Sequence, residues 1–373
     1  MRVLFKVFFL FVPFLFLTSC YADQQPELKK SSYDIEQCNK TSYTQEDLKS
    51  YEALIDKGEI QGYNCVALYY ARKNELQKAK EYFQKGADKG SIESYAQLGS
   101  LYSSAFKEPN KALPYYKIAA NAGHIKAAHN LGVEYDRRLD YTNALKWYSK
   151  AASEGNVYSL LAVGTIYLKE HRYEEAVETF KKVGELGESK GYFNLGVFYR
   201  KNKAFRDDQK GIDNYLKCYK MGNGECAAAL GVYYEEEKKD YSKAIEWYKK
   251  GFELGSKEST ARLGFIYWEV LKDNKKAIFW FQQGYEKLGC ISCALALGNI
   301  YEITLKDYNN AIKWYKTAYE NGEPRAAYNV GLMYQDHLKN KEKAIEWYNK
   351  SLNTQYKAIT QERLKELGVE DEQ

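Results

Sequence analysis

Two stretches of this sequence decide its fold. Residues 127–135 read Ala-Ala-His-Asn-Leu-Gly-Val-Glu-Tyr, and residues 326–334 read Ala-Ala-Tyr-Asn-Val-Gly-Leu-Met-Tyr. They share a pattern, in which Leu or Val is followed by Gly and then by Tyr three residues after the glycine, and this pattern returns along most of the chain. The glycine position falls at residues 67 (an alanine), 99, 132, 164, 196, 231, 264, 298 and 331. These positions are 32 to 35 residues apart, a fixed period that is typical of a solenoid. The sequence therefore predicts nine structural repeats.

Each repeat carries two helical patterns. The first pattern has small or apolar residues at four positions relative to the glycine: −4, −1, 0 and +3. Residues at these positions lie on one face of a helix. A second pattern starts at a small residue and has aromatic residues three and four positions later, as in Trp147-Tyr148 after Ala144. We expect Asp140, Asp240, Asp273 and Asp307 to cap these second helices. Glycines that suit a left-handed residue after a helix follow at positions 58, 90, 123, 155, 187, 222, 255, 289 and 322.

The spacing of these marks predicts where the repeats vary in length. Each helix-ending glycine lies nine residues before the next glycine position, whereas the distance from the glycine position to the second pattern varies from 12 to 15 residues. We therefore expect the turn between repeats to be fixed by stacking. Length variation should be confined to the turn inside a repeat, with residues 201–208 forming a protruding charged loop.

The two opening stretches resemble the first helix of a Sel1-like repeat, a relative of the tetratricopeptide repeat. Residues 147–155 (Trp-Tyr-Ser-Lys-Ala-Ala-Ser-Glu-Gly) resemble its second helix. The resemblance implies an all-α fold, a right-handed αα-superhelical solenoid of about nine helix pairs over residues 46–354. The turn inside each repeat is shorter than the usual Sel1-like turn, so the choice between the two labels stays open. Residues 355–373 should form a capping helix and tail.

The N-terminus is expected to direct export. Residues 1–19 combine a basic start with an apolar run, Val7–Leu17, that is too short to span a bilayer. The ending Leu-Thr-Ser-Cys20 resembles a bacterial lipobox, which implies that Cys20 becomes lipidated and that residues 20–45 link the anchor to the repeats. Tyr21, in place of the aspartate that favours inner-membrane retention, points to the periplasmic side of the outer membrane. The alternative is cleavage after Ala22, which gives a free secreted protein.

Seven cysteines fit an oxidising compartment, because six remain after Cys20 is assigned to lipid. Residues 217–226 resemble the stapled turn of cysteine-rich Sel1-like proteins, which implies a Cys218–Cys226 bridge. Cys293 has the same repeat position as Cys226, which favours a structural bridge to Cys290 over a redox C-x-x-C site or a zinc site. Cys38 and Cys65 then pair by elimination.

Composition and motifs argue against an enzyme. A net charge of +5, spread evenly, is too weak for a nucleic-acid binder. The sequence has no G-x-S-x-G, H-E-x-x-H or Walker motif. Its four histidines, at positions 124, 129, 171 and 337, are scattered over different repeat positions. We expect no catalytic site, cofactor, metal or small-molecule substrate.

Arrays of this kind bind proteins along the concave face lined by their first helices. Two residues before the glycine position stand Gln97, Asn130, Asn194, Arg262 and Asn329, candidates for holding the backbone of a bound protein. The alternative is that they brace the neighbouring repeat. We predict an exported, lipid-anchored interaction scaffold or adaptor whose membrane contact is the lipid alone. The resemblance also implies an alternative, an immunity lipoprotein that neutralises a phospholipase-type toxin, and a secreted cysteine-stapled factor is a third possibility.

Lipidation can be tested directly at Cys20. Radiolabelled palmitate should enter the parent chain and be lost in Cys20→Ala, because the acyl chains attach to this residue. Cys38→Ala is the matched control and should keep the label. Equal labelling of Cys20→Ala and the parent would exclude the anchor, and an unlabelled parent would favour the secreted factor.

Overall fold

The computed structural model of the protein describes residues 38, 42–354 and 356–369. Over these residues it consists of 20 α-helices joined by short turns, which confirms the predicted all-α fold. None of the described helices is both long enough and apolar enough to cross a membrane.

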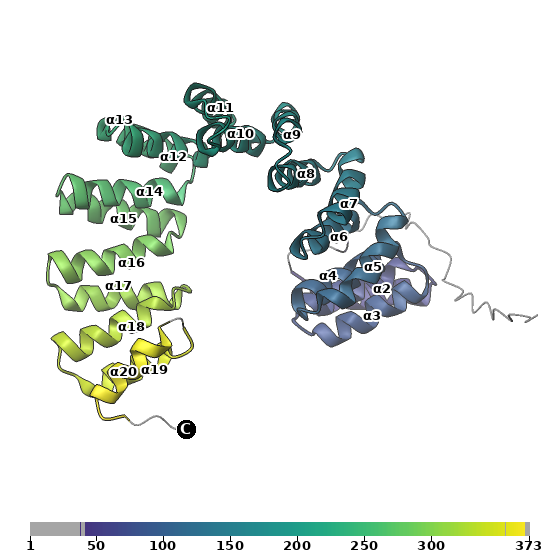
Figure 1. Ribbon diagram of the computed structural model, residues 1–373. Helices are drawn as coiled ribbons and strands as arrows, with labels where there is room; N and C mark the ends of the chain where they lie inside the picture. Colours follow the sequence, from purple (N-terminus) through teal and green to yellow (C-terminus); the bar gives the residue numbers. More distant parts are fainter. Residues whose placement is uncertain (1–37, 39–41, 355, 370–373) are drawn as a thin grey trace, which may run out of the picture. The chain divides into compact units, whose positions relative to one another are not determined.

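The helices form two compact units, which divide after Asn156 (Figure 1). The even spacing of the repeats gives no sign of this division. The helices of the first unit are α1 (Gln45–Asp56), α2 (Gln61–Arg72), α3 (Leu76–Asp88), α4 (Ile92–Ser100), α5 (Pro109–Asn121), α6 (Ile125–Arg137) and α7 (Tyr141–Ser153). Those of the second unit are α8 (Val157–Lys169), α9 (Tyr173–Glu185), α10 (Ser189–Lys201), α11 (Asp208–Lys220), α12 (Gly224–Val232), α13 (Tyr241–Glu253), α14 (Lys257–Phe265), α15 (Asn274–Leu288), α16 (Ile291–Asn299), α17 (Tyr308–Glu320), α18 (Arg325–Leu332), α19 (Lys341–Ser351) and α20 (Lys357–Glu366).

The helices α2 to α19 pair as the nine repeats, with α1 before the first pair and α20 after the last. The predicted caps are confirmed, because Asp140, Asp240, Asp273 and Asp307 each accept a backbone N–H from the first turn of the helix that follows. All nine helix-ending glycines have positive φ. In α20, Leu364 is buried in the last apolar cluster, whereas Ile359 is exposed.

The core of eight of the nine repeats is a contact between the glycine of the first helix and an aromatic ring of the second, and the first repeat has Ala67 at the glycine position. A β-carbon placed on the glycine would lie only 2.3 to 2.8 Å from the ring. The contacts join Gly99 to Tyr116, Gly132 to Tyr148, Gly164 to Phe180, Gly196 to Tyr215, Gly231 to Tyr248, Gly264 to Phe281, Gly298 to Tyr315 and Gly331 to Tyr348. Only glycine allows the ring to approach so closely.

Several of these rings also bond to the first helix through their hydroxyl groups. Tyr315 donates to Asn299 Oδ1 at 2.7 Å and Tyr348 donates to Gln335 Oε1 at 2.6 Å. Burial raises the pKa of both phenols above the usual range, so both remain protonated donors at neutral pH.

The expectation about length variation is wrong for five repeats. Where the second pattern starts 13 residues after the glycine position, the extra residue lies inside the first helix as a wider π turn rather than in the loop. These π turns are Leu101–Ala105, Tyr233–Glu237, Ile266–Val270, Ile300–Thr304 and Met333–His337. The turn is wider because the closing N–H bonds five residues back, as from Leu271 to Ile266. The residue that caps the next helix still bonds to the carbonyl of the repeat tyrosine, Asp140 to Tyr135 in a short repeat and Asp273 to Tyr267 in a long one.

The longest connection, between α10 and α11, does not simply protrude. Phe205 folds back onto Phe198 and Tyr173, with ring centroids 5.5 and 5.3 Å away. Arg206 reaches Glu237 of the next repeat, with Nη2 and Oε2 2.8 Å apart. The loop is therefore packed against the array by one ring and one ion pair.

Arg200, at the end of α10, lies four residues after the glycine position, where no other repeat has a basic residue. It is buried, its guanidinium lies 4.5 Å from the centre of the Tyr233 ring, and it pairs with Glu237. Its stem occupies the space where Gly211 stands in place of the usual alanine, because a β-carbon there would lie 2.3 Å from Arg200 Cγ. Arg200, Gly211 and Glu237 thus form one linked substitution across two repeats.

The glycine–ring contact predicts a large effect for Gly298→Val. Overpacking costs about 1–3 kcal/mol, so we expect the free energy of unfolding to fall by about 2 kcal/mol in urea titrations followed by circular dichroism. Lys313→Val, at an exposed position of the facing helix α17, is the matched control. Its effect should stay near 0.5 kcal/mol, and equal effects of the two changes would contradict this role for the glycine.

Candidate functional site

The five residues predicted to bind a partner all lie half-buried on first helices. Gln97 on α4 and Asn130 on α6 belong to the first unit. Arg262 on α14 belongs to the second unit, as do Asn194 on α10 and Asn329 on α18. They share a repeat position, but their surroundings differ.

The side chains of three of the five, Gln97, Asn130 and Arg262, already form hydrogen bonds or ion pairs within the protein. Gln97 donates to Glu93 of its own helix at 2.6 Å. Asn130 donates to the Tyr116 hydroxyl of the preceding repeat at 3.4 Å.

Arg262 pairs with Glu258 at 2.8 Å and reaches back to Glu235 at 3.4 Å. Together with the bond from Asn130 to the preceding repeat, this contact fits the alternative interpretation, in which the position braces neighbouring repeats.

Asn194 and Asn329 have no hydrogen-bond partner for their side chains among the described residues. Asn194 also lines a cavity of about 380 Å³, a size suited to one ligand side chain or a small ligand. The lining comprises Thr165, Leu168, His171, Tyr173, Phe180, Asn194, Val197, Phe198, Lys201 and Asn202. Asn194 therefore combines a free amide with an apolar recess.

The repeat geometry explains this cavity. Phe180 from α9 packs on Gly164 and lines the cavity, while Phe198 is held by its contacts with Tyr173 and Phe205. Leu168 on α8 and Val197 on α10 complete a mostly apolar lining. Lys201 is exposed and has no ion pair in the described chain. The arrangement offers an apolar recess with the unbonded amide of Asn194 and the ammonium group of Lys201 beside it, while the second amide of the lining, Asn202, accepts the backbone N–H of Ala204.

A second cleft, of about 280 Å³, lies in the first unit and contains a residue that the sequence reasoning missed. Glu134 is 2% exposed at a position where every other repeat has a large apolar residue. It pairs with Arg137 at 3.0 Å and Arg138 at 3.1 Å, and it accepts a hydrogen bond from Ser103. Comparing one position across all repeats would have found this carboxylate.

The four histidines each have a structural contact. His124 caps α6 and lies 2.9 Å from Glu93, and His337 stacks on Tyr308 at 3.9 Å. His129 packs on Tyr148, and burial lowers its pKa. His171 lies 2.7 Å from the Tyr173 hydroxyl. Within the described ranges, no three His, Cys, Asp or Glu residues converge as metal ligands would.

Comparison with known families identifies the repeats. Seven segments match the Sel1 repeat and together cover more than half of the chain: residues 68–91, 92–124, 125–156, 189–223, 224–256, 258–287 and 324–353. The chain is a Sel1-repeat protein. Residues 291–321 match a tetratricopeptide repeat instead, and α8 and α9 form a helix pair that neither match includes.

Several solved structures are similar to this chain. A protective antigen of uropathogenic Escherichia coli is 24% identical, with 87% of this chain and 84% of that chain covered and a TM-score of 0.45. A Sel1 repeat protein from Oxalobacter formigenes is 23% identical, with 64% and 99% covered and a TM-score of 0.45. An immunity protein from Pseudomonas aeruginosa is 20% identical, with 48% and 72% covered and a TM-score of 0.35. No curated protein matches the sequence.

The cysteines of this Sel1-repeat protein lie at disulfide distance in the three expected pairs, Cys38–Cys65, Cys218–Cys226 and Cys290–Cys293. Cys20 lies outside the described residues. The Cys218–Cys226 pair joins α11 to α12 across the fixed turn between two repeats.

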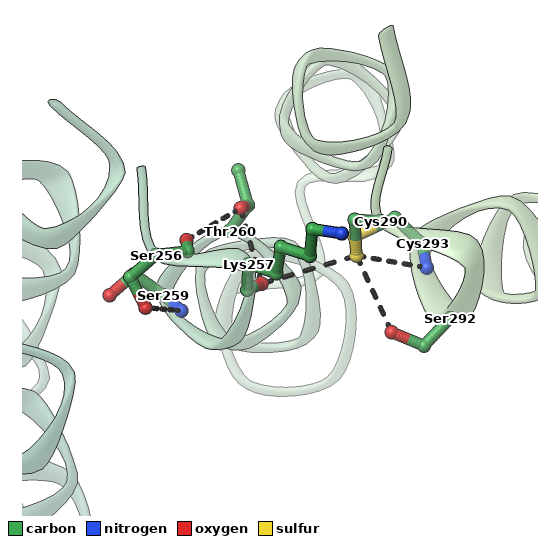
Figure 2. The surroundings of a disulfide bond; sticks show 7 residues. All are labelled: Ser256, Lys257, Ser259, Thr260, Cys290, Ser292 and Cys293. Carbon is green, nitrogen blue, oxygen red and sulfur yellow. Dashed lines mark hydrogen bonds between the residues drawn. A yellow bond between two sulfur atoms is a disulfide. The ribbon is translucent and has the colours of Figure 1, made fainter. Parts of the chain in front are cut away.

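Cys290 and Cys293 have a structural setting. Cys290 caps α16 by accepting the backbone N–H of Cys293 at 3.2 Å, and its sulfur lies 4.0 Å from the Lys257 carbonyl (Figure 2). The two residues are only 2% and 0% exposed, so a protein substrate cannot reach their sulfurs. Cys226 and Cys293 occupy a position that is Gly, Ala or Ser in the other repeats. A small buried side chain is what this position requires.

The three pairs are expected to stabilise the fold in the order of the loops they close. The sequence separations are 27, 8 and 3 residues. From the entropy of loop closure, we expect the disulfides to raise the free energy of unfolding by about 3–4 kcal/mol for Cys38–Cys65, 2–3 kcal/mol for Cys218–Cys226 and 1–2 kcal/mol for Cys290–Cys293. This order is checked by urea unfolding of three variants, in each of which both cysteines of one pair are replaced by serine. Replacing only one cysteine of a pair should leave its partner as a free thiol that can be titrated. A larger loss for the Cys290–Cys293 pair than for Cys218–Cys226 would contradict the loop argument.

Proposed function

We propose that this protein is a non-enzymatic interaction scaffold that binds an extended segment of a protein partner at the cavity of α8, α9 and α10. The observation that carries the proposal is Asn194, whose amide lacks a partner in the described chain and lies beside an apolar recess of about 380 Å³. Helix-pair arrays use such first-helix surfaces for protein recognition.

The chemistry of the site fits a peptide. An asparagine amide offers both a donor and an acceptor, and a peptide group offers the complementary acceptor and donor. The apolar recess has room for one large side chain, such as leucine or phenylalanine. Lys201, unpaired and exposed, favours an acidic residue next to that side chain.

We also propose that the scaffold works outside the cytoplasm, anchored through a lipid on Cys20 at the periplasmic side of the outer membrane. Support comes from the three cysteine pairs at disulfide distance, because such bonds persist in oxidising compartments. The lipobox-like sequence before Cys20 supports the anchor.

The binding site can be tested with a defined probe. A display library of random peptides, selected on the full chain, should yield sequences that share one large apolar residue. In fluorescence anisotropy, Asn194→Leu should weaken the selected peptide about tenfold or more, since it removes the paired amide. Asn329→Leu is the matched control, because Asn329 has the same repeat position and a free amide, and it should bind as the parent does.

Two results would contradict this site. One is unchanged affinity in Asn194→Leu, and the other is an equal loss in Asn329→Leu. Circular dichroism of each variant establishes that the helices remain folded.

The partner's identity separates the adaptor from the immunity protein. A C-terminally tagged chain is used to recover partners from envelope extracts of the parent strain and of a competitor, and mass spectrometry identifies them. A single stoichiometric partner with a hydrolase domain supports an immunity protein. Several resident envelope proteins, each competed by the selected peptide, support the adaptor.

A further inference from the structure

The polar groups at the end of α10 offer hydrogen-bond donors to a ligand in the cavity of α8, α9 and α10. Lys201 and Asn202 both line this cavity. The ammonium group of Lys201 carries three N–H donors and no acceptor. The Oδ1 atom of Asn202 accepts the backbone N–H of Ala204 at 3.1 Å, and its NH2 group bonds to no other described residue. A ligand at this end of the cavity should therefore supply acceptor atoms.

The turn before α9 lacks the acidic residue that stands at the same place in other repeats. Arg172 is the N-cap of α9, whereas the N-cap of the second helix is Asp or Glu in seven of the other eight repeats and Asn in one. Those residues are Glu75, Glu108, Asp140, Asp207, Asp240, Asp273 and Asp307, with Asn340 in the last repeat. Arg172 pairs with Glu170 at 3.3 Å and with Glu175 at 2.8 Å. Both carboxylates of this turn are thus neutralised locally.

The carboxylates near the other side of the cavity are also engaged. Asp207 accepts the backbone N–H of Lys210 at 3.0 Å at the start of α11. Arg206 pairs with Asp208 at 3.1 Å and with Glu237 at 2.8 Å. None of these three acids lines the cavity.

The remaining charges favour an anion. The exposed Glu174 and Glu178 project from a different face of α9 than Phe180, which lines the cavity. The ten lining residues include no carboxylate. Lys201 is exposed and pairs with no other described residue, and the same holds for Lys203 two residues later. An apolar recess therefore adjoins an ammonium group that lacks a counter-charge.

Backbone geometry limits which anion can reach this ammonium while an apolar side chain fills the recess. Neighbouring side chains of an extended peptide point to opposite sides, and the next side chain on the same side lies about 7 Å away. An acidic neighbour could therefore meet Lys201 only in a bent peptide. A C-terminal residue carries its α-carboxylate on the same Cα atom as its side chain. Its two groups can enter one cavity together.

We propose that the cavity binds the C-terminal residue of a protein partner. The apolar side chain of that residue fills the recess, and its α-carboxylate accepts hydrogen bonds from Lys201 and Asn202. Asn194 pairs with the last peptide group. The inference rests on the proposed function and specifies which part of the partner is bound. The occupant follows from charge complementarity, because a carboxylate supplies both the negative charge and the acceptors that this end of the cavity lacks.

Peptides that differ only at their C-terminus test the proposal. A library of random peptides displayed with a free C-terminus, selected on the full chain, should be enriched in sequences that end in a large apolar residue. One selected sequence is labelled at its N-terminus and measured by fluorescence anisotropy in three forms: the free acid, the C-terminal amide and a form extended by Gly-Ser. The free acid should bind about tenfold more tightly than the other two, because only it places a carboxylate beside the apolar side chain. This preference should shrink at high salt.

Two substitutions locate the carboxylate contact. Lys201→Gln should weaken the free acid about tenfold and leave the amide unchanged. Asn202→Asp keeps an acceptor for the Ala204 N–H and replaces the NH2 donor by a carboxylate oxygen, so it should also weaken the free acid alone. Lys203→Gln is the matched control, because Lys203 is an unpaired, exposed lysine that does not line the cavity, and it should keep the full preference.

The outcomes separate this inference from the proposed function. Equal affinity for the acid and the amide, with binding still weakened by Asn194→Leu, would overturn the C-terminal site and leave the peptide site standing. An equal loss of preference in Lys203→Gln and Lys201→Gln would also overturn it. N-acetyl-leucine that binds as tightly as the peptide would assign the cavity to a small apolar acid instead. Failure to select any peptide would contradict the proposed function and this inference together.

Discussion

The structure depends on one repeated contact, the aromatic ring that packs directly against a glycine of the opposing helix. At a separation too small for a β-carbon, the ring sets the distance between the two helices of a repeat. It also places the hydroxyl of several tyrosines within reach of the first helix. Because the glycine face is fully used in this way, other faces of the first helix are free to carry side chains such as Asn194 and Arg262.

The π turns show which atoms must keep their places when a residue is inserted. The residue that caps the second helix always bonds to the carbonyl of the repeat tyrosine, whether the repeat is short or long. The inserted residue widens the helix between these two points and leaves the packing on either side unchanged. As a result, insertions alter the outer end of a repeat without disturbing its core.

Much of the fold was predictable, because helix pairs, caps and helix-ending glycines depend on residues close in sequence. The π turns were not predictable from the sequence. The spacing of the apolar residues is the same in short and long repeats up to the repeat tyrosine, and the extra residue lies after that tyrosine. The site was only partly predictable. Gln97, Asn130 and Arg262 share a position with Asn194, but Glu93, Tyr116 and Glu235 occupy their polar groups, and these partners do not recur from repeat to repeat.

The linked residues Arg200, Gly211 and Glu237 have a consequence for how such an array can change during evolution. Repeat proteins are often regarded as strings of exchangeable modules, which grow or shrink by duplication and deletion of single repeats. Here the arginine and the glycine that makes room for it belong to one repeat, while the carboxylate that pairs with it belongs to the next. Deleting the second repeat alone would take Glu237 from the buried Arg200 guanidinium and leave it only Asp208, 3.8 Å away, whereas deleting the first would take the arginine from Glu237. At this point the smallest unit that can be inherited, moved or transplanted intact is two repeats.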